Sequence, residues 1–338
     1  MLNPERPAPN SLVDPYGRVH TDLRISVTDR CNIRCWYCMS AQRPQFRPHG
    51  EILSFEEIAR FVAAAADWGI RKVRLTGGEP LVRRHVVGLV EMLVALPGIN
   101  EVAMTTNGIL LEQHAGALKA AGLNRLNISL DTLSPDKYRQ VSRRDELPRV
   151  LAGIAAARQA GFLHIKLNCV AIRGVSEDEI IPLARFAREH DLELRLIEFM
   201  PLGGDRQWTR DRVLPGEEIL EMLTAAFGPL EPVAAVEAPA PAREYRFRDG
   251  GGRIGLVPSV SRPFCDQCTR LRLTADGKLR NCLFSTDQWD VRAVLRAGGT
   301  REQLAELLQI AVRAKKKARG TDHGEFAAAD RPMHQIGG

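Results

Sequence analysis

Short apolar runs alternate with longer amphipathic segments between residues 24 and 200. The apolar runs predict six strands, at residues 24–29, 72–76, 101–106, 125–130, 164–172 and 193–200. The segments between them have helical spacing and predict helices at 54–68, 84–96, 110–121, 147–160 and 177–189. Alternation of strands with helices predicts a parallel sheet with right-handed crossovers. Because no Gly-x-Gly-x-x-Gly turn follows the first strand, the pattern favours an α/β fold with a partial, TIM-like (β/α)6 barrel over a dinucleotide-binding sheet.

The pattern changes after residue 201, where turns replace helices between strands. We expect a helix at 215–227, hairpins pairing 243–248 with 253–257 and 269–274 with 278–282, and helices at 288–297 and 300–317. The run from Lys315 to Lys317 should be a solvated helix end that complements the helix dipole. We therefore divide the chain into an N-terminal arm (1–20), a barrel (21–205) and a C-terminal region (206–338). Residues 1–12 of the arm should be flexible.

The overall composition is that of a globular protein, with 44% hydrophobic and 26% charged residues among 338. No apolar run approaches the roughly 18 residues of a membrane span, and the first residues lack the apolar core of a signal peptide. We therefore expect a cytoplasmic protein without a membrane partner. The net charge of +6, carried largely by arginine, fits a polyanionic ligand, since arginine can bind phosphate through two parallel hydrogen bonds.

Six of the seven cysteines form two sets of three, and an odd total in a cytoplasmic chain argues against a disulfide framework. The first set, Cys31-x3-Cys35-x2-Cys38, lies in the loop after the first strand, at the barrel end where active sites form. Three thiolates can ligate three irons of a [4Fe–4S] cluster and leave the fourth iron open to a small molecule. The alternative is a zinc site completed by a histidine such as His20 or His49.

The second set is Cys265-x2-Cys268-x13-Cys282, in the C-terminal region. Three interpretations compete: a zinc ribbon that recruits Cys169, a fully ligated cluster that needs further cysteines, and a three-thiolate [4Fe–4S] cluster, which fits the count best. Arg270 and Arg272 lie two apart in a predicted strand and so share a face. Two guanidinium groups beside an open cluster suit a triphosphate, and the alternative is a pair of exposed strand arginines.

Two motifs resemble those of radical S-adenosylmethionine (SAM) enzymes. CNIRCWYC at 31–38, after LRISVTDR, resembles the cluster-binding loop of that superfamily, and GGEP at 77–80 resembles the motif that binds the methionine amino group. The resemblance implies reductive cleavage of SAM to methionine and a 5′-deoxyadenosyl radical. It also implies that Tyr37 lies against the adenine.

Further segments make the resemblance closer. They are LRISVTDRCNIRCWYCM, RLTGGEPLVR, TTNG, NISLDTL, IKLNCV, IEFMPLG, FCDQCTRLRLTADGKLRNCLF and the final IGG. Together they resemble the GTP 3′,8-cyclase family of molybdenum cofactor biosynthesis. Its members convert GTP to 3′,8-cyclo-7,8-dihydro-GTP after hydrogen abstraction at C3′. The resemblance therefore implies a lyase of the radical SAM type with two [4Fe–4S] clusters, the second carried by the C-terminal extension.

The resemblance also implies roles for individual residues. GTP would contact Arg24, Arg74, Thr105, Lys166, Arg270 and Arg272; SAM would contact Tyr37, Gly78, Ser129 and Met200; the clusters would bind Cys31, Cys35, Cys38, Cys265, Cys268 and Cys282. The Gly337-Gly338 tail would enter the active site, and Cys169 has no role that the family pattern assigns. The implied partners are a flavodoxin- or ferredoxin-like electron donor, the downstream cyclic pyranopterin monophosphate synthase, and a second copy in a candidate homodimer.

Two rival functions remain at this stage. A radical enzyme that modifies peptides would need more cluster cysteines than the C-terminal region contains. A non-catalytic regulator that binds nucleic acid would need a basic recognition helix or an aromatic stacking platform, and the sequence shows neither. We therefore expect no nucleic-acid partner.

Overall fold

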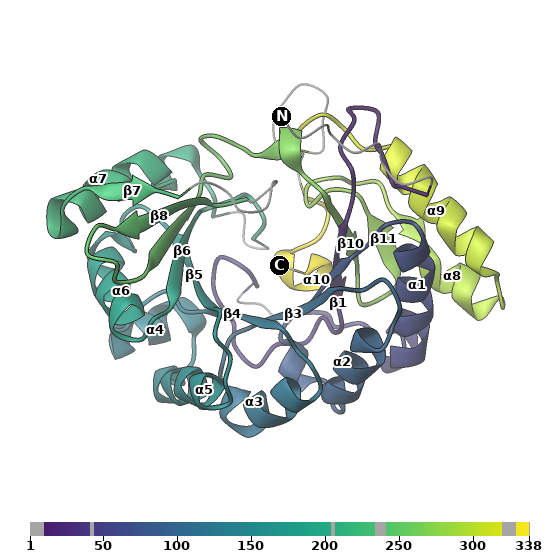
Figure 1. Cartoon of the computed structure of the whole chain (residues 1–338), viewed down its shortest axis with the longest axis horizontal. Coiled ribbons are helices and arrows are strands. Elements are labelled where there is room, and N and C mark those ends of the chain that lie inside the picture. The colour runs from purple at the N-terminus through teal and green to yellow at the C-terminus, as the bar shows by residue number, and fades with distance from the viewer. Residues whose placement is uncertain (1–9, 41–43, 204–206, 234–240, 320–328, 338) are drawn as a thin grey trace.

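The computed structural model describes residues 10–40, 44–203, 207–233, 241–319 and 329–337. Within them, all strands belong to one curved sheet. Its order is β12 (Trp289–Asp290), β11 (Lys278–Arg280), β10 (Arg270–Leu273), β1 (Asp22–Ser26), β2 (Lys72–Thr76), β3 (Glu101–Thr106), β4 (Arg125–Ser129), β5 (Ile165–Ala171), β6 (Glu193–Glu198), β9 (Arg253–Val257), β8 (Arg243–Phe247) and β7 (Leu230–Pro232). Strands β1 to β6 pair in parallel, as predicted. Figure 1 shows the sheet curving around a central space with helices on its outside.

The crossover helices follow the predicted order. They are α1 (Phe55–Asp67), α2 (Val86–Val94), α3 (Leu111–Ala120), α4 (Pro135–Ser142), α5 (Leu147–Gln159) and α6 (Glu177–Glu189). A capping box fixes the start of α1, because the Ser54 hydroxyl accepts from the Glu57 N–H and the Glu57 carboxylate accepts from the Ser54 N–H. Helix α4 is absent from the sequence prediction. It is polar and buries only Tyr138, Val141 and Ser142, so no apolar periodicity marks it.

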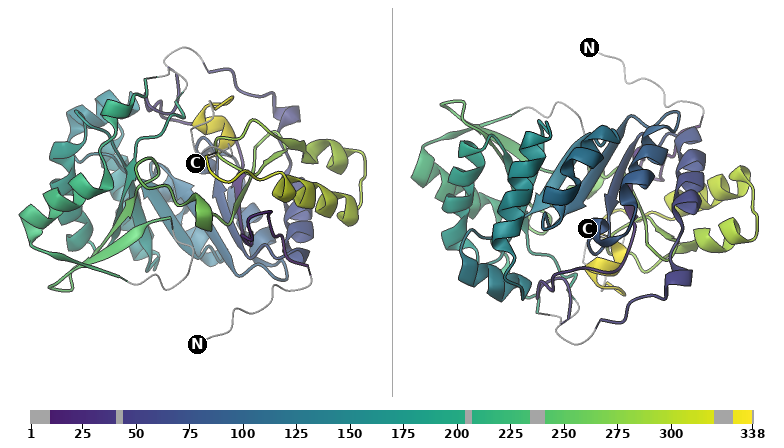
Figure 2. Two further views of the ribbon diagram at one scale, coloured as in Figure 1. Left: turned by 90° about the horizontal axis from the view of Figure 1, so that it is seen from above. Right: turned by 90° about the horizontal axis from the view of Figure 1, so that it is seen from below.

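The C-terminal region extends the barrel sheet at both edges. Strand β10 pairs in parallel with β1, and β9 pairs in parallel with β6. Both predicted hairpins are present, as the antiparallel pairs β8–β9 and β10–β11. Helix α7 (Gly216–Phe227) lies on one flank, and α8 (Val291–Arg296) and α9 (Arg301–Arg313) lie on the other (Figure 2). The last helix, α10 (Met333–Ile336), lies near the centre of the barrel (Figure 1).

Three details of the sequence prediction are wrong. The helix expected at 288–297 begins only after the short strand β12, and the helix expected at 300–317 ends at Arg313. Leu12, in the segment expected to be flexible, is 2% exposed and belongs to the hydrophobic core. Residues 1–9 of that segment lie outside the described residues.

Short 3₁₀ turns complete the fold, at His49–Glu51, Pro80–Val82, Arg210–Arg212 and Cys265–Gln267. None of the helices in the described part of the chain combines the length and apolar character needed to cross a membrane.

Helix α5 packs closely at a glycine against the turn that precedes α3. A Cβ at Gly153 would lie 2.2 Å from the carbonyl oxygen of Gly108, so Gly153→Ala should lower the free energy of unfolding by about 1–3 kcal/mol. Gly116→Ala is the control, because nothing lies within 4 Å of its added Cβ. There, the better helix propensity of alanine should raise the free energy of unfolding by up to about 1 kcal/mol. Urea denaturation followed by circular dichroism measures both; equal midpoints would contradict the packing argument.

Candidate active site

A cavity of about 340 Å³ lies inside the barrel. Each of the parallel strands β1 to β6 contributes at least one lining side chain, and the cysteines of both sets line it as well. The two sets are more than 200 residues apart in sequence, yet they face one cavity because β10 pairs directly with β1. The structure therefore brings both expected cluster sites to a single chamber.

Backbone hydrogen bonds hold the first cysteine loop. The N–H groups of Cys38 and Met39 donate to the Cys35 carbonyl at 3.0 and 2.9 Å, which forms a tight turn. The N–H of Arg34 donates to the Ser142 carbonyl at 2.9 Å, so α4 supports the loop from behind. Burial raises the pKa of the Cys31 thiol to about 11 and that of Cys38 to about 12. These thiols therefore require a bound cation to become thiolates.

The GGEP segment packs directly against the first cysteine loop. A Cβ at Gly78 would lie 2.3 Å from the carbonyl oxygen of Arg30, so only glycine fits there. The buried Glu79 carboxylate accepts from the Thr106 hydroxyl and the Asn107 N–H, both at 2.7 Å. Burial raises its pKa to about 7. Glu79 thus ties the end of β2 to the end of β3 beneath the cavity.

The other residues expected around SAM also line the cavity: Tyr37, Ser129 and Met200. The Tyr37 hydroxyl donates to the Asp131 carboxylate at 2.5 Å, and that carboxylate also accepts from the Val170 N–H at 2.9 Å. The Tyr37 ring is therefore fixed against the cavity wall by a partner at the end of β4.

Arginines from three neighbouring strands meet inside the cavity. Arg24 of β1 is in register with Arg74 of β2 on one side and Arg272 of β10 on the other. Burial, together with the neighbouring positive charges, lowers the pKa of Arg74 to about 10 and that of Arg272 to about 9. Within the described part of the chain, the guanidinium groups of Arg24 and Arg74 form no hydrogen bond or ion pair. Cations that line a cavity without counter-charges are costly, so this wall is suited to a polyanion.

The predicted pairing of Arg270 with Arg272 on one face is confirmed, since both line the cavity. Arg272 is 5% exposed, and the Arg270 guanidinium lies 4.6 Å from the centre of the Phe264 ring. The alternative of two exposed strand arginines is therefore wrong. Thr105 also lines the cavity.

Lys166 lies elsewhere. It is outside the cavity lining, and its ammonium is 2.7 Å from the Glu193 carboxylate, so its predicted contact with GTP stays a prediction. Further polar residues line the cavity that were not predicted from the sequence, namely Asn127, Asn168, Arg195 and Asn281. Within the described residues, the side-chain oxygens of Asn127 and Asn168 are buried without a hydrogen-bond partner. Polar residues inside otherwise apolar strands were the available signal for them.

The zinc alternatives gain no support from the geometry. His20 bonds to Asp14 at 3.0 Å, His49 is exposed, and neither lines the cavity. Cys169 is buried in β5, where its thiol lies 3.7 Å from the Asp131 carbonyl, and it too lies outside the cavity lining. Among the described residues, no three His, Cys, Asp or Glu side chains are placed to hold a single metal ion. Two sets of soft thiol ligands do fit iron–sulfur clusters.

The expectation that the lysine run is a solvated helix end is wrong for Lys315. This residue is 5% exposed and lies against the second cysteine set, where its ammonium is 3.8 Å from the Cys268 sulfur. Burial alone would raise the pKa of the Cys268 thiol, but the charges of Lys315 and Arg270 outweigh it and lower the pKa to about 6.

The C-terminal tail enters the cavity region. Arg272 donates to the Gly337 carbonyl, and a Cβ at Gly337 would lie 2.9 Å from the Thr76 methyl carbon. Met333 and His334 line the cavity. Gly338, the other half of the predicted double glycine, lies outside the described residues.

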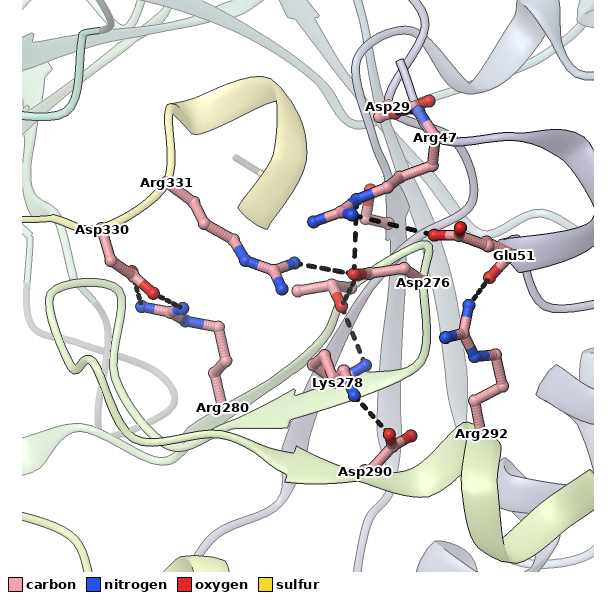
Figure 3. A network of polar contacts seen from close by, with 12 residues as sticks. Asp29, Arg47, Glu51, Asp276, Lys278, Arg280, Asp290, Arg292, Asp330 and Arg331 are labelled. Carbon is pink, nitrogen blue, oxygen red and sulfur yellow. Dashed lines mark hydrogen bonds and ion pairs between the residues drawn. The ribbon is translucent and has the colours of Figure 1, made fainter. Parts of the chain in front are cut away.

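Two ion pairs hold the base of this tail (Figure 3). Arg331 donates to the Asp276 carboxylate at 2.9 and 3.0 Å, and Arg280 donates to the Asp330 carboxylate at 2.9 and 3.2 Å. Arg47, in the segment after the first cysteine loop, lies 3.7 Å from the same Asp276 carboxylate. The tail is thus fastened to the hairpin between Cys268 and Cys282.

Asp330→Asn should release the tail. The change removes the negative charge opposite Arg280, which is fully buried, while Asp330 itself is 32% exposed. We expect a loss of about 1–2 kcal/mol, or a roughly tenfold larger population with the tail released, measured as faster carboxypeptidase digestion. Asp136→Asn, which breaks an exposed ion pair with Arg139, should leave digestion unchanged. Equal digestion rates for both variants would contradict the anchoring role.

Comparison with known proteins agrees with this geometry. The sequence matches the radical SAM superfamily over residues 25–187 and the family described as Molybdenum Cofactor Synthesis C over residues 192–321. It is 48% identical to a GTP 3′,8-cyclase of Rhodopirellula baltica, covering 98% of this chain and 93% of that protein. It is 45% identical to a GTP 3′,8-cyclase of Streptomyces coelicolor, covering 97% and 96%.

Solved structures confirm the fold. The structure of Streptococcus suis SuiB bound to S-adenosylmethionine has a TM-score of 0.63 at 15% sequence identity, covering 87% of this chain and 69% of that one. The radical SAM superfamily implies one [4Fe–4S] cluster and SAM, and the first cysteine loop fits both. By its sequence matches, its barrel and its two sets of cavity cysteines, the chain belongs to the GTP 3′,8-cyclase family of radical SAM enzymes.

Proposed function

We propose that this chain converts GTP to (8S)-3′,8-cyclo-7,8-dihydroguanosine 5′-triphosphate, the first step of molybdenum cofactor biosynthesis. One observation carries the proposal: two sets of three thiols share a cavity with a row of in-register arginines. The thiols suit radical chemistry, and the arginines suit a nucleoside triphosphate. Relatives of nearly equal length at 45–48% identity bear the corresponding name.

Cys31, Cys35 and Cys38 would hold the [4Fe–4S] cluster, with one iron left open for SAM. The SAM contacts would come from Tyr37, Gly78, Ser129 and Met200. When bound, these groups supply a 5′-deoxyadenosyl radical that can remove the hydrogen at C3′ of GTP. The protein positions the substrate and keeps water out of the chamber, since a carbon radical must meet one hydrogen and nothing else.

The substrate would lie along the arginine wall. Arg24, Arg74 and Thr105 would contact GTP from the barrel side, and Arg270 and Arg272 from the C-terminal region. The triphosphate would supply the counter-charge that the guanidinium groups of Arg24 and Arg74 lack, through charge-assisted hydrogen bonds. For Lys166 to join them, its ammonium would exchange the Glu193 carboxylate for a phosphate oxygen.

The second cysteine set would hold a second [4Fe–4S] cluster. Cys265, Cys268 and Cys282 offer three thiolates, which leaves one iron open to a nitrogen or oxygen of the guanine. Cys169 lies in β5, outside the cavity lining, so it does not offer a fourth ligand in this arrangement. The guanine would then lie between this cluster and the arginines of β10.

The proposed reaction requires an electron donor and an enzyme that uses its product. A flavodoxin- or ferredoxin-like protein would supply single electrons, and cyclic pyranopterin monophosphate synthase would take the cyclic product onward. We also propose a cytoplasmic location, a homodimer, and a division into the arm (1–20), the barrel (21–205) and the C-terminal region (206–338). The parallel β1–β10 pairing means that the last two share one continuous sheet.

An anaerobic incubation of the iron-loaded protein with dithionite, SAM and GTP tests the proposal. Mass spectrometry should detect 5′-deoxyadenosine together with the cyclic GTP product, and omission of GTP should remove the latter. Formation of 5′-deoxyadenosine with unchanged GTP would support SAM cleavage by the chain but refute GTP as its substrate. Absence of both products, with iron bound, would refute the proposed function.

A further inference from the structure

Lys315 is bonded to the backbone at both ends of the β10–β11 hairpin, beside Cys268 and Cys282. Its ammonium donates to the Asn281 carbonyl at 2.7 Å and to the Arg270 carbonyl at 3.0 Å. Asn281 directly precedes Cys282, and Arg270 lies two residues after Cys268. The same ammonium is 3.8 Å from the Cys268 sulfur. One side chain thus sets the spacing between two of the three candidate ligands.

Arg18 holds the third ligand and the segment of Lys315 together. Its guanidinium donates to the Cys265 carbonyl at 2.7 Å and to the carbonyls of Lys317 and Lys316 at 2.8 and 2.9 Å. The Asp14 carboxylate, 2.6 Å away, compensates the charge of Arg18. The N-terminal arm is therefore part of the support of this site.

The positive charge of Lys315, unlike that of Arg18, is not compensated by a carboxylate of the described residues. Within the described residues, the ammonium has carbonyl partners and a thiol but no carboxylate partner. Burying a cation costs several kcal/mol unless an anion faces it. The negative charge of three thiolates exceeds the positive charge of an oxidised [4Fe–4S] core by one. The cluster with its ligands is therefore an anion, and reduction adds another negative charge. A cluster on this cysteine set would therefore be the anion that Lys315 faces.

We propose that Lys315 is a positioning residue of the second cluster, which fixes its ligand strands and stabilises its reduced state by charge, while Arg18 contributes to ligand placement alone. The inference rests on the proposed second cluster. It distinguishes the two cations by their counter-charges: Arg18 is neutralised by Asp14, whereas Lys315 is neutralised by the site itself.

The test uses the full-length chain with Cys31, Cys35 and Cys38 replaced by serine, so that only the second cluster remains. Iron per chain and the midpoint potential, followed by electron paramagnetic resonance in a redox titration, are measured without any turnover. Lys315→Met should shift the reduction equilibrium of the cluster about tenfold toward the oxidised form, which lowers the midpoint potential by about 59 mV for one electron. It should also lower the amount of iron bound per chain. Lys316→Met is the matched control, because it removes an exposed lysine from the same run and should match the parent.

Two further variants separate charge from folding. Lys315→Arg keeps the charge and should keep the parent potential, even where less iron binds. Arg18→Met should lower the bound iron but leave the potential of the remaining cluster unchanged. If Lys315→Met keeps the potential and iron of Lys316→Met, or if Lys315→Arg shifts the potential as far as Lys315→Met, the role of Lys315 is refuted. A parent chain that binds no iron would instead refute the second cluster itself, and the inference with it.

Discussion

Cys35→Ser is expected to abolish SAM cleavage. Cys35 is the middle candidate ligand of the first set and lines the cavity, and burial raises the pKa of its thiol well above the usual value. Serine has nearly the same shape but lacks the soft sulfur that binds iron. Since even outer-shell changes around a metal cost 10- to 100-fold, loss of a ligand should lower 5′-deoxyadenosine formation more than about 100-fold. Cys31→Ser and Cys38→Ser should behave alike.

Two measurements make this expectation specific. Cys169→Ala removes a thiol that is buried but lies outside the cavity lining, and it should retain SAM cleavage. Cys35→Ser should also lose about half of the bound iron while the second set keeps its share. Cleavage by Cys35→Ser at the rate of Cys169→Ala would show that the first set does not hold the cluster.

The barrel was predictable because its strands and helices carry local signals. Strands β2 and β3 and helix α6 have the predicted bounds, since apolar runs and amphipathic periodicity are properties of neighbouring residues. Helix α4 was missed because it is polar and buries only three residues. Its Ser142 and Val141 carbonyls accept hydrogen bonds from the first cysteine loop. A contact of that kind leaves no periodic trace in the sequence.

The sequence predicted many of the residues that line the cavity but not how they are placed relative to one another. The spacing of the cysteines marked both sets, but nothing local predicts that β10 pairs with β1 and brings Arg272 into register with Arg24. The same long-range packing determines which groups two lysines contact. Lys166 pairs with Glu193, and Lys315 lies beside Cys268 rather than at a solvated helix end. Charge is visible in a sequence, whereas the partner that a charge will face is not.

Arg270→Ala and Arg272→Ala should each lower kcat/KM for GTP by roughly 10- to 100-fold, and the double variant by roughly 10²- to 10⁴-fold. A charge-assisted hydrogen bond is worth about 1.5–3 kcal/mol, and each 1.36 kcal/mol is tenfold in rate. Both side chains line the cavity, and Arg272 also donates to the Gly337 carbonyl, so its loss should affect kcat as well as KM.

Arg253→Ala is the control. It changes an exposed side chain of β9 outside the cavity lining and should leave kcat/KM unchanged. The first cysteine set is intact in all of these variants, so 5′-deoxyadenosine should still form while cyclic product falls. GTP turnover by the double variant at the rate of Arg253→Ala would remove both arginines from the substrate site and leave the row of Arg24 and Arg74 to bind the triphosphate.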